Sequence, residues 1–419
     1  MSINDVIVSQ RAERDMLLSQ AYQARQTRYD IAMLLSTTEI KLITGPRRAG
    51  KSTMALLMLR DRNFAYLNFD DAMLLDGWDE SGVMAALERV YPGYEYLLLD
   101  EVQNLPQWDL WVSKLYRRGQ HLVITGSNAR MLSSEMATVL TGRYLPIEIL
   151  PLSLSEVLQW RGLSSTDKGT MAVESVVDDY LRWGGFPETI NSRAIAGTYL
   201  STLFEAIVLK DMAVRHRVRR AEDLTRMALF LLANIGRPMS YNSLAQAVGL
   251  SSVNTVKRYV GYMCEPFLFF MLPRYDKRLR LQQRAQRKVY VCDNGFVAAR
   301  AFRVSEDRGR LLENLVFVEL MRRGYNAERS LFYYHSHTDK EVDFVLRSGT
   351  QIEQLIQVCY DMSAPKTRKR EVDALIESAE ELGCDRLTII TYHETNVITR
   401  GKYTVRVMPV LSWQNEREL

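Results

Sequence analysis

The sequence predicts an α/β fold whose first part is a parallel sheet, and three observations carry this prediction. Short apolar runs alternate with helical patterns between residues 40 and 127. The first of these runs ends in a glycine-rich loop with the spacing GxxxxGK followed by Ser. A chain of 419 residues is too long for one core, so we expect further domains after the sheet.

The composition is that of an ordinary globular protein, which excludes collagen-like and disordered chains: 47% of the residues are hydrophobic and 25% charged. The four cysteines form no CxxC pair, so neither a zinc cage nor a disulfide framework is indicated. The polar N-terminus lacks the apolar core of a signal peptide, and no apolar run of about 18 residues occurs. We therefore expect a cytoplasmic protein without a membrane segment.

The first domain is predicted from four apolar strands with helical patterns between them. The strands are expected at 40–45, 64–70, 94–101 and 121–127, and the helices at 52–60, 82–90 and 109–118. Strands that alternate with helices fold as βαβ units, whose strands are parallel. A stretch without Pro or Gly at 5–37 predicts an amphipathic helix or helix pair before the sheet, and Pro146 and Pro151 mark the end of the unit.

The loop after the first strand predicts a binding site for the phosphates of ATP. Its residues are Gly45, Pro46, Arg47, Arg48, Ala49, Gly50, Lys51, Ser52 and Thr53. The glycines let successive N–H groups point at a phosphate, and the following helix adds the positive end of its dipole. Lys51 is expected to hold β- and γ-phosphate oxygens and Ser52 to ligate Mg²⁺. Arg47 and Arg48 are alternative phosphate contacts.

Two neighbouring strand ends predict the groups that act on the nucleotide. Asp100 and Glu101 follow an apolar strand, and we expect Asp100 to hold Mg²⁺ and Glu101 to orient and polarise the attacking water. The next strand ends in Thr125-Gly126-Ser127-Asn128. A polar side chain at that position could contact the γ-phosphate or the water, with Ser127 as the first choice and Asn128 as the second.

These three segments resemble an AAA+ ATPase, and more narrowly the predicted bacterial and archaeal AAA+ ATPases with a C-terminal nuclease-like domain. The resemblance covers most of residues 35–360 and extends to LTGRY at 140–144, PLS at 151–153, WGGFPE at 183–188, VYVCDNG at 289–295 and GRLLEN at 309–314. It implies an ATPase core with N-terminal helices at 1–158, a helical lid region at 159–222 and assembly into a homo-oligomer. Arg143 is implied as an arginine finger or sensor, or it serves only to hold the fold.

The middle of the chain is basic, with 17 Lys or Arg against 6 Asp or Glu between residues 210 and 300. Residues 241–250 and 251–260 have a helix, Gly turn, helix pattern, and 223–287 resembles a winged helix. Asn254, Lys257 and Arg258 could face a DNA groove. A run of basic residues could flank or form a wing: Arg274, Lys277, Arg278, Arg280, Arg284, Arg287 and Lys288. We therefore expect a nucleic-acid partner, with DNA favoured; the alternative is a module that contacts protein.

The C-terminal part, 288–419, resembles the PD-(D/E)xK fold of restriction endonucleases. Strands are expected at 288–292, 331–334, 341–346, 355–358 and 386–391, and helices at 311–323 and 366–382. The resemblance implies Glu313 as the helix acid and Asp343 as the strand acid. Gln357 and Cys359 stand where the fold has an acid and a Lys. Because an amide binds Mg²⁺ less well than a carboxylate and Cys carries no positive charge, we expect a degenerate and inactive site.

Three functions follow from these predictions. The favoured one is an ATPase that couples Mg-ATP hydrolysis to a conformational change on nucleic acid. The alternatives are an ATP-regulated, metal-dependent nuclease of defence or mobile-element biology, and a nucleotide-dependent switch that binds protein and no DNA.

Overall fold

The structure is a computed structural model that describes residues 2–127, 140, 142–164, 169–301 and 307–416. The chain divides into two compact units, one of residues 1–150 with 265–267 and one of residues 151–264 with 268–419. The first unit contains one sheet and the second unit contains two. No helix in the described ranges is long and apolar enough to cross a membrane.

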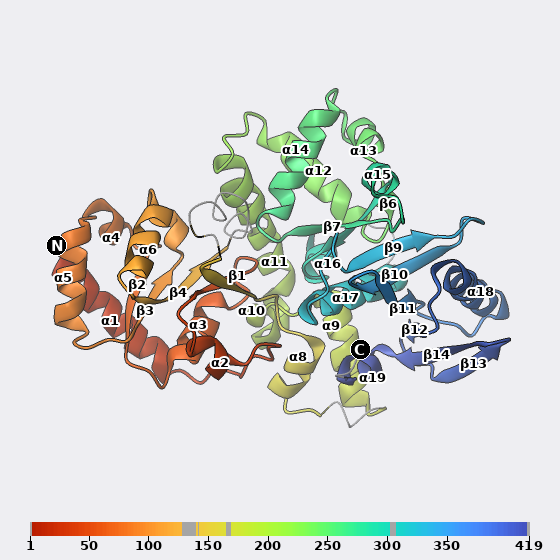
Figure 1. Ribbon diagram of the computed structural model, residues 1–419, viewed down its shortest axis with the longest axis horizontal. Coiled ribbons are helices and arrows are strands. Elements are labelled where there is room, and N and C mark those ends of the chain that lie inside the picture. Colours follow the sequence, from red (N-terminus) through yellow and green to blue (C-terminus); the bar gives the residue numbers. More distant parts are fainter. Residues whose placement is uncertain (1, 128–139, 141, 165–168, 302–306, 417–419) are drawn as a thin grey trace. The chain divides into compact units, whose positions relative to one another are not determined.

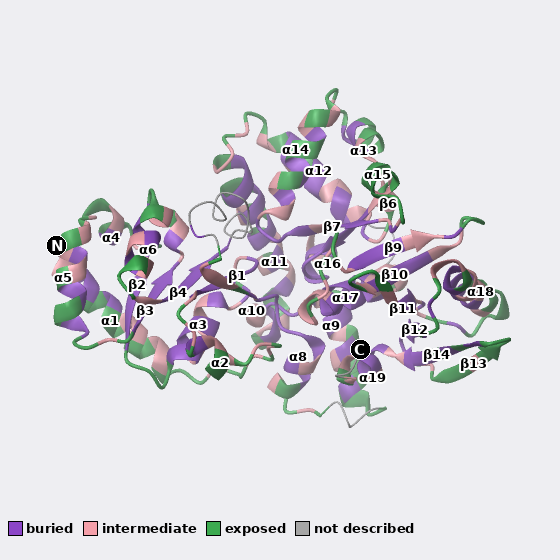
Figure 2. Ribbon diagram, viewed as in Figure 1, coloured by how far each residue is buried: buried purple, intermediate pink, exposed green. Residues whose placement is uncertain are grey.

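The first unit is built on a five-stranded parallel sheet in the order β2-β3-β4-β1-β5 (Figure 1). Its strands are β1 (Ile40–Thr44), β2 (Phe64–Asn68), β3 (Tyr96–Asp100), β4 (His121–Gly126) and β5 (Tyr144–Glu148). Its helical segments are α1 (Ile3–Ser19), α2 (Ile31–Leu35), α3 (Lys51–Leu59), α4 (Ala72–Asp76), α5 (Glu80–Val90), the 3₁₀ turn η1 (Val102–Asn104) and α6 (Trp108–Arg117). Every residue of β1 and β3 is buried, as expected for parallel strands covered by helices on both faces (Figure 2).

The stretch 5–37 forms a helix pair, one of the two expected arrangements, because α1 ends at Ser19, residues 20–30 are neither helix nor strand, and α2 follows. One detail of this unit differs from the expectation. Pro146, expected to mark the end of the unit, lies inside the additional strand β5. Among the described residues this strand pairs only with β1, and an edge strand tolerates a proline because one side of it needs no ladder hydrogen bonds.

The second unit begins with helices and continues with a small antiparallel sheet in the order β6-β8-β7. The helical segments are α8 (Leu154–Trp160), α9 (Met171–Trp183), α10 (Pro187–Asn191), η3 (Arg193–Ile195), α11 (Ala196–Ala206), the π-helical η4 (Ile207–Val214) and α12 (Ala221–Ala233). They are followed by β6 (Pro238–Met239), α13 (Tyr241–Val248), α14 (Val253–Cys264), β7 (Phe269–Pro273), α15 (Leu279–Arg284) and β8 (Arg287–Val291). The predicted helix, Gly turn, helix pattern is confirmed, since Gly249 ends α13 in the left-handed conformation.

The chain ends in a six-stranded mixed sheet in the order β13-β14-β12-β11-β10-β9. Its strands are β9 (Leu331–His335), β10 (Glu341–Ser348), β11 (Gln351–Val358), β12 (Leu387–Thr391), β13 (Asn396–Arg400) and β14 (Tyr403–Pro409). The helices of this region are α16 (Gly295–Arg300), α17 (Arg308–Arg322), α18 (Pro365–Leu382) and α19 (Val410–Asn415). The strands and helices expected up to residue 391 are present, whereas β13, β14 and α19 were not predicted.

Three of the segments that carry the family resemblance contact one another inside the second unit. The Asp293 carboxylate accepts hydrogen bonds from the N–H groups of Gly185 at 2.7 Å and Gly295 at 2.8 Å. A Cβ atom on Gly184, whose φ is +69°, would lie 1.7 Å from the Asp293 carboxylate. Asn314 in turn bonds to the backbone of Val291 on β8. These segments therefore hold the unit together from within, which explains their residue types without a role in chemistry.

Candidate functional site

The glycine-rich loop joins β1 to α3 at the carboxyl edge of the first sheet. Gly45 follows the buried Thr44 with φ +149°, and a Cβ atom there would lie 1.9 Å from the Ile149 carbonyl oxygen. The loop can therefore leave the strand only with a glycine at this position. Lys51 is the first residue of α3, so the N-terminal N–H groups of this helix face the same space as the loop.

Lys51 points into the loop and is only 4% exposed. Its Nζ donates a hydrogen bond to the Pro46 carbonyl oxygen at 3.1 Å and lies 3.6 Å from Oε1 of Glu101. Neither contact is a short ion pair. The ammonium is thus held in the loop by partners that a phosphate oxygen could replace.

Asp100 is the last residue of β3, and three hydroxyl groups donate to it, the Tyr66 hydroxyl to Oδ2 at 3.4 Å. The Ser52 Oγ lies 2.8 Å from Asp100 Oδ1, and the Thr125 hydroxyl donates to the same oxygen. Burial raises the pKa of Asp100 to about 6, against the lowering effect of the Thr125 hydrogen bond. A buried carboxylate beside a serine hydroxyl is the donor set that Mg²⁺ prefers, so these residues fit the ion that the loop implies.

Glu101 turns its side chain toward Lys51 because its backbone is in the left-handed region, with φ +52°. Its N–H donates to the Thr125 hydroxyl at 2.9 Å, and the Gln103 side chain donates to its carboxylate. Ser127 Oγ lies 3.4 Å from Glu101 Oε2. The structure therefore brings Lys51, Glu101 and Ser127 together, as expected; Asn128 lies outside the described residues.

Arg143 lies at the other end of the sheet. Its carbonyl oxygen accepts a hydrogen bond from the N–H of Ile40, the first residue of β1, and its guanidinium lies 5.6 Å from the centre of the Tyr116 ring. The phosphate loop follows the last residue of β1, and β5 runs parallel to β1. Arg143 is consequently not brought to the loop of its own chain. Of the two arginines in the loop, Arg48 is exposed and Arg47 is half-buried.

Arg25 is a residue of this site that the sequence analysis missed. It lies in the non-helical stretch 20–30, and its guanidinium donates to the carbonyl oxygens of Ala49 at 2.8 Å and Leu150 at 2.7 Å. It therefore ties the N-terminal stretch to the phosphate loop. The sequence offers no spacing signal for this contact, because 24 residues separate Arg25 from Ala49.

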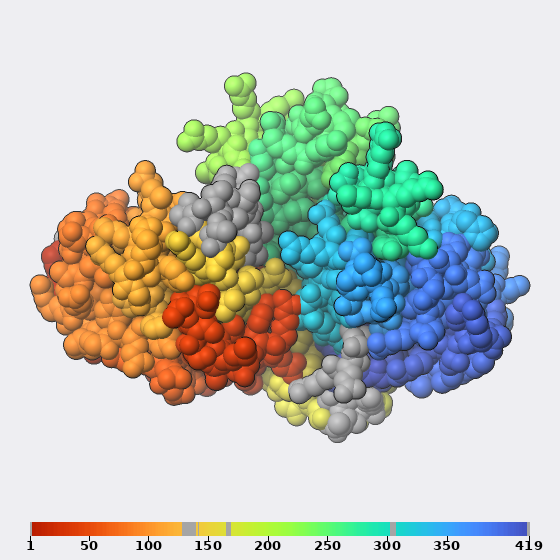
Figure 3. Space-filling model, in the orientation of Figure 1, coloured from red at the N-terminus to blue at the C-terminus, as the bar shows by residue number. Residues whose placement is uncertain are grey.

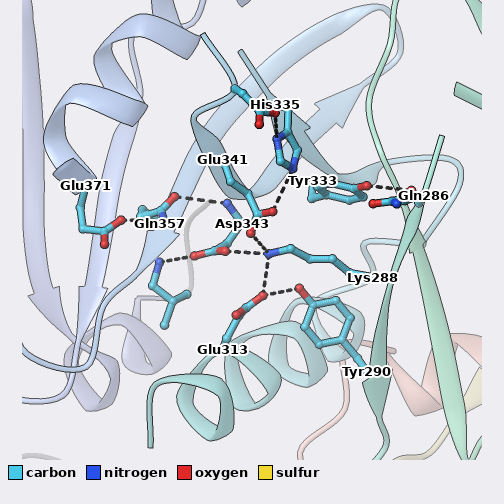
Figure 4. A network of polar contacts seen from close by, with 12 residues as sticks. Gln286, Lys288, Tyr290, Glu313, Tyr333, His335, Glu341, Asp343, Gln357 and Glu371 are labelled. Atoms are coloured by element: carbon cyan, nitrogen blue, oxygen red, sulfur yellow. Dashed lines mark hydrogen bonds and ion pairs between the residues drawn. The ribbon is translucent and has the colours of Figure 1, made fainter. Parts of the chain in front are cut away.

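A second buried polar site lies in the second unit, where β8, α17, β10 and β11 meet (Figure 4). Glu313, Asp343 and Gln357 all contribute to it, as expected: the Asp343 N–H donates to Gln357 Oε1 at 3.2 Å. Glu313 and Asp343 are joined through Lys288, whose Nζ lies 2.9 Å from Glu313 Oε1 and 2.8 Å from Asp343 Oδ1. The sequence pattern assigns Lys288 to the exposed basic run, and this prediction is wrong because its side chain is fully buried.

The side chains proposed to contact nucleic acid are all exposed. Asn254, Lys257 and Arg258 lie on the outer face of α14, and Arg278 and Arg280 lie at the start of α15. Figure 3 shows α15, in blue-green, on the surface of the second unit. A cavity of about 300 Å³ lies between α13, α14 and β8, with Tyr241, Lys257, Arg284 and Arg287 among the residues that line it.

Comparison with protein families divides the chain into three matched regions. The family described as AAA domain matches residues 37–158. Two families described as domains of unknown function, DUF8612 and DUF4143, match residues 174–307 and 308–413.

Two curated relatives match nearly the whole chain. An uncharacterized protein of Haemophilus influenzae is 30% identical over 86% of this chain and 92% of its own length. An uncharacterized protein of Methanocaldococcus jannaschii is 29% identical over 94% of this chain and 92% of its own length. Among solved structures, a Walker-type ATPase of Pyrococcus abyssi covers 68% of this chain and 99% of its own, with 12% identity and a TM-score of 0.45.

Proposed function

We propose that this chain hydrolyses ATP with Mg²⁺ and couples hydrolysis to a conformational change on nucleic acid. The premise is that the chain belongs to the same family as the Haemophilus influenzae relative and carries an AAA-type P-loop ATPase domain. One observation carries the ATPase part of the proposal. A buried lysine and a serine hydroxyl at the start of α3 converge with two carboxylates at the end of β3, beside the glycine-rich loop.

Each side chain of the site has a distinct task in this reaction. Lys51 would exchange the Pro46 carbonyl and Glu101 for phosphate oxygens, which places its charge where negative charge develops. Ser52 and Asp100 would hold Mg²⁺, which supplies positive charge to the phosphate oxygens. Glu101, released by Lys51, would orient a water and accept its proton, with Ser127 close enough to bond the same water.

The nucleic-acid part of the proposal rests on the middle of the chain. The order α12, β6, α13, α14, β7, β8 with an antiparallel sheet supports the interpretation of 223–287 as a winged-helix-like domain. Its third helix, α14, buries Val256, Tyr259 and Met263 and leaves Lys257 and Arg258 outside. Exposed cations on such a helix suit the phosphates of duplex DNA.

The experiment that tests this proposal is ATP hydrolysis by the full chain, measured alone and with single- and double-stranded DNA and RNA. A several-fold stimulation by duplex DNA is expected. Hydrolysis that none of the four nucleic acids changes would remove the coupling but leave the ATPase. Absence of hydrolysis under every condition would remove the ATPase itself.

A nucleotide-dependent switch that binds protein is the second candidate, and one observation favours it. Leu279 and Leu281 on α15 are 65% and 46% exposed, beside the exposed Arg278 and Arg280. Apolar side chains among cations suit a protein surface better than a phosphate backbone. Affinity for DNA that is absent, or that does not fall with added salt, would favour this candidate.

Arg143 suggests that the working form is a homo-oligomer. Because it lies at the far end of the sheet from its own loop, it could reach a phosphate only in another copy of the chain. A mixture of Arg143→Ala and Lys51→Met chains is expected to recover activity that neither variant has alone, since mixed assemblies contain one intact site. No recovery, with Arg143→Ala active on its own, would assign Arg143 to the fold.

A further inference from the structure

The polar site of the C-terminal region is centred on one ammonium group. Lys288 projects from β8, and its Nζ lies within salt-bridge distance of three carboxylates, Glu313 at 2.9 Å, Glu341 at 2.7 Å and Asp343 at 2.8 Å. Figure 4 shows the three acids pointing at the Lys288 ammonium, Glu313 from α17 and Glu341 and Asp343 from β10. The side chain of Lys288 is 0% exposed.

We infer that Lys288 is a fixed internal cation that takes the place of the divalent metal implied by the nuclease resemblance, so that this site binds no metal and cuts no nucleic acid. The inference is independent of the ATP site. It also names the role of the site: Lys288 ties β8 of the small sheet to α17 and to β10 of the large sheet.

The ammonium of Lys288 has as many carboxylate partners as it has N–H bonds. An ammonium has three N–H bonds, and the three carboxylates of Lys288 match them one to one. A magnesium or manganese ion in the same position would need about six oxygen ligands and would lie against the ammonium, a like charge. The residues therefore do not fit the metal while Lys288 is in place.

Each of these acids also has a donor besides Lys288. Asp343 Oδ2 accepts from the Val358 N–H at 3.0 Å, and Glu313 Oε1, the oxygen that contacts Lys288, also accepts from the Tyr290 hydroxyl at 2.6 Å. Glu341 Oε2 lies 2.9 Å from His335 Nε2. A metal that took these oxygens would displace the donors as well as Lys288, and the buried Tyr290 hydroxyl would lose its acceptor.

Gln357 carries the oxygen that the nuclease resemblance implies as the third metal ligand. Gln357 Oε1 already accepts the Asp343 N–H, and the Gln357 amide donates to Glu371 Oε2 at 2.9 Å. This side chain therefore holds β10 to α18. It presents no free oxygen toward Lys288.

The charges of the site also balance without a metal. Burial alone would lower the pKa of Lys288, but Asp343 and Glu313 raise it well above its usual range, so the ammonium stays charged. Burial raises the pKa of Glu313 to about 7, and the hydrogen bond to Glu341 raises the pKa of His335. Lys288 therefore supplies a permanent positive charge to the three acids without a metal.

The test is Mn²⁺ binding to the full chain without nucleotide, followed by electron paramagnetic resonance, in parallel with a Mn²⁺-dependent DNA cleavage assay. The wild type and Asp343→Asn are expected to bind Mn²⁺ alike and to leave DNA intact. Lys288→Met, which keeps the length of the side chain and removes the charge, is expected to gain about one Mn²⁺ per chain. The double variant Lys288→Met, Asp343→Asn should lose that ion again.

Several results would overturn the inference. A Mn²⁺ ion in the wild type that Asp343→Asn abolishes would show that metal enters beside Lys288, and cleavage lost in Asp343→Asn would make the domain a nuclease. A folded Lys288→Met chain that gains no ion would show that the ammonium does not occupy a metal position. Should Lys288→Met not fold, the comparison of the wild type with Asp343→Asn still decides whether metal binds.

Discussion

Lys51 and Lys288 are both buried lysines that face carboxylates, but their surroundings differ in one respect. Lys51 has one carbonyl oxygen at 3.1 Å and one carboxylate at 3.6 Å. Lys288 has three carboxylates between 2.7 and 2.9 Å. A lysine that binds a ligand is held by contacts that can be exchanged, whereas a lysine that closes a site has every donor paired with an acid.

The phosphate loop has a lysine whose partners a ligand can replace, whereas the C-terminal site already has all its charged partners. At the phosphate loop the ammonium has only a carbonyl oxygen and one long ion pair, contacts that a phosphate oxygen can replace. At the C-terminal site the cation is already neutralised by acids of its own chain. Residue type alone therefore does not assign a function to a buried lysine beside acids. The number of its ion pairs and their N···O distances separate the two cases.

The largest effect is expected from Lys51→Met. Removing the ammonium should lower the rate of ATP hydrolysis by about 10³-fold, because the charge that stabilises the transferred phosphate is lost. The free energy of unfolding should change by less than about 1 kcal/mol, since the ammonium makes only weak interactions within its own chain. Steady-state hydrolysis and urea unfolding measure the two quantities, with Lys114→Met on α6 as the control. Hydrolysis at the wild-type rate would end the assignment of Lys51.

Lys288→Met should have the opposite signature. It leaves three carboxylates buried around an uncharged side chain, so we expect the free energy of unfolding of the second unit to fall by about 3–5 kcal/mol. Hydrolysis of ATP by the folded fraction should persist. Lys340→Met is the matched control, because its ion pair to Glu377 is half exposed. Equal losses in the two variants would contradict the distinction drawn between Lys51 and Lys288.

The substitution Asp100→Asn tests an acid of the phosphate site instead of its lysine. The pKa of Asp100 is about 6 in the folded protein against 3.8 as its ordinary value, so wild-type stability falls as pH rises through this window. In nucleotide-free protein we therefore expect the variant to be more stable than the wild type by about 3 kcal/mol at pH 7.5 and equal to it near pH 3.5. Calorimetry at both pH values measures the difference. A variant less stable at pH 7.5 would show that the Asp100 charge is fully compensated.

The smallest effect is expected from the pair Lys257→Ala and Arg258→Ala. These exposed cations should each contribute one phosphate contact, so the variant should bind duplex DNA more weakly and its salt slope should be smaller by about two. Lys366→Ala with Lys369→Ala on α18 removes the same charge elsewhere and serves as the control. If the two double variants bind duplex DNA equally, the weaker binding results from the lost net charge and not from a DNA contact at α14.

The phosphate site could be predicted from the sequence because its residues follow one another or end neighbouring strands. Gly45 to Thr53 is a continuous segment, and Glu101 and Ser127 come directly after apolar runs whose carboxyl ends meet at one edge. The exception is Arg25, which reaches the loop from a stretch without regular structure.

The C-terminal site could be predicted only in part. Lys288 is 25 residues from Glu313 and 55 from Asp343, and only the fold brings them together. In the sequence Lys288 belongs to a basic run, and such a run predicts an exposed side chain. Its position in the strand RKVYV offered a weaker contrary signal, since Lys288 and Tyr290 alternate with period two and both face the acids. Strand β13 could not be predicted at all, because four of its five residues are exposed and show no apolar pattern.

The most direct test of the ATP site is a single-turnover measurement on Glu101→Gln. This variant is expected to bind Mg-ATP with wild-type affinity, because Lys51, Ser52 and Asp100 are intact, and to hydrolyse the bound ATP about 10²–10³-fold more slowly. Glu95→Gln, just before the start of the same strand, should behave as the wild type. Hydrolysis by Glu101→Gln at the wild-type rate, or no ATP bound by the wild type, would contradict the account.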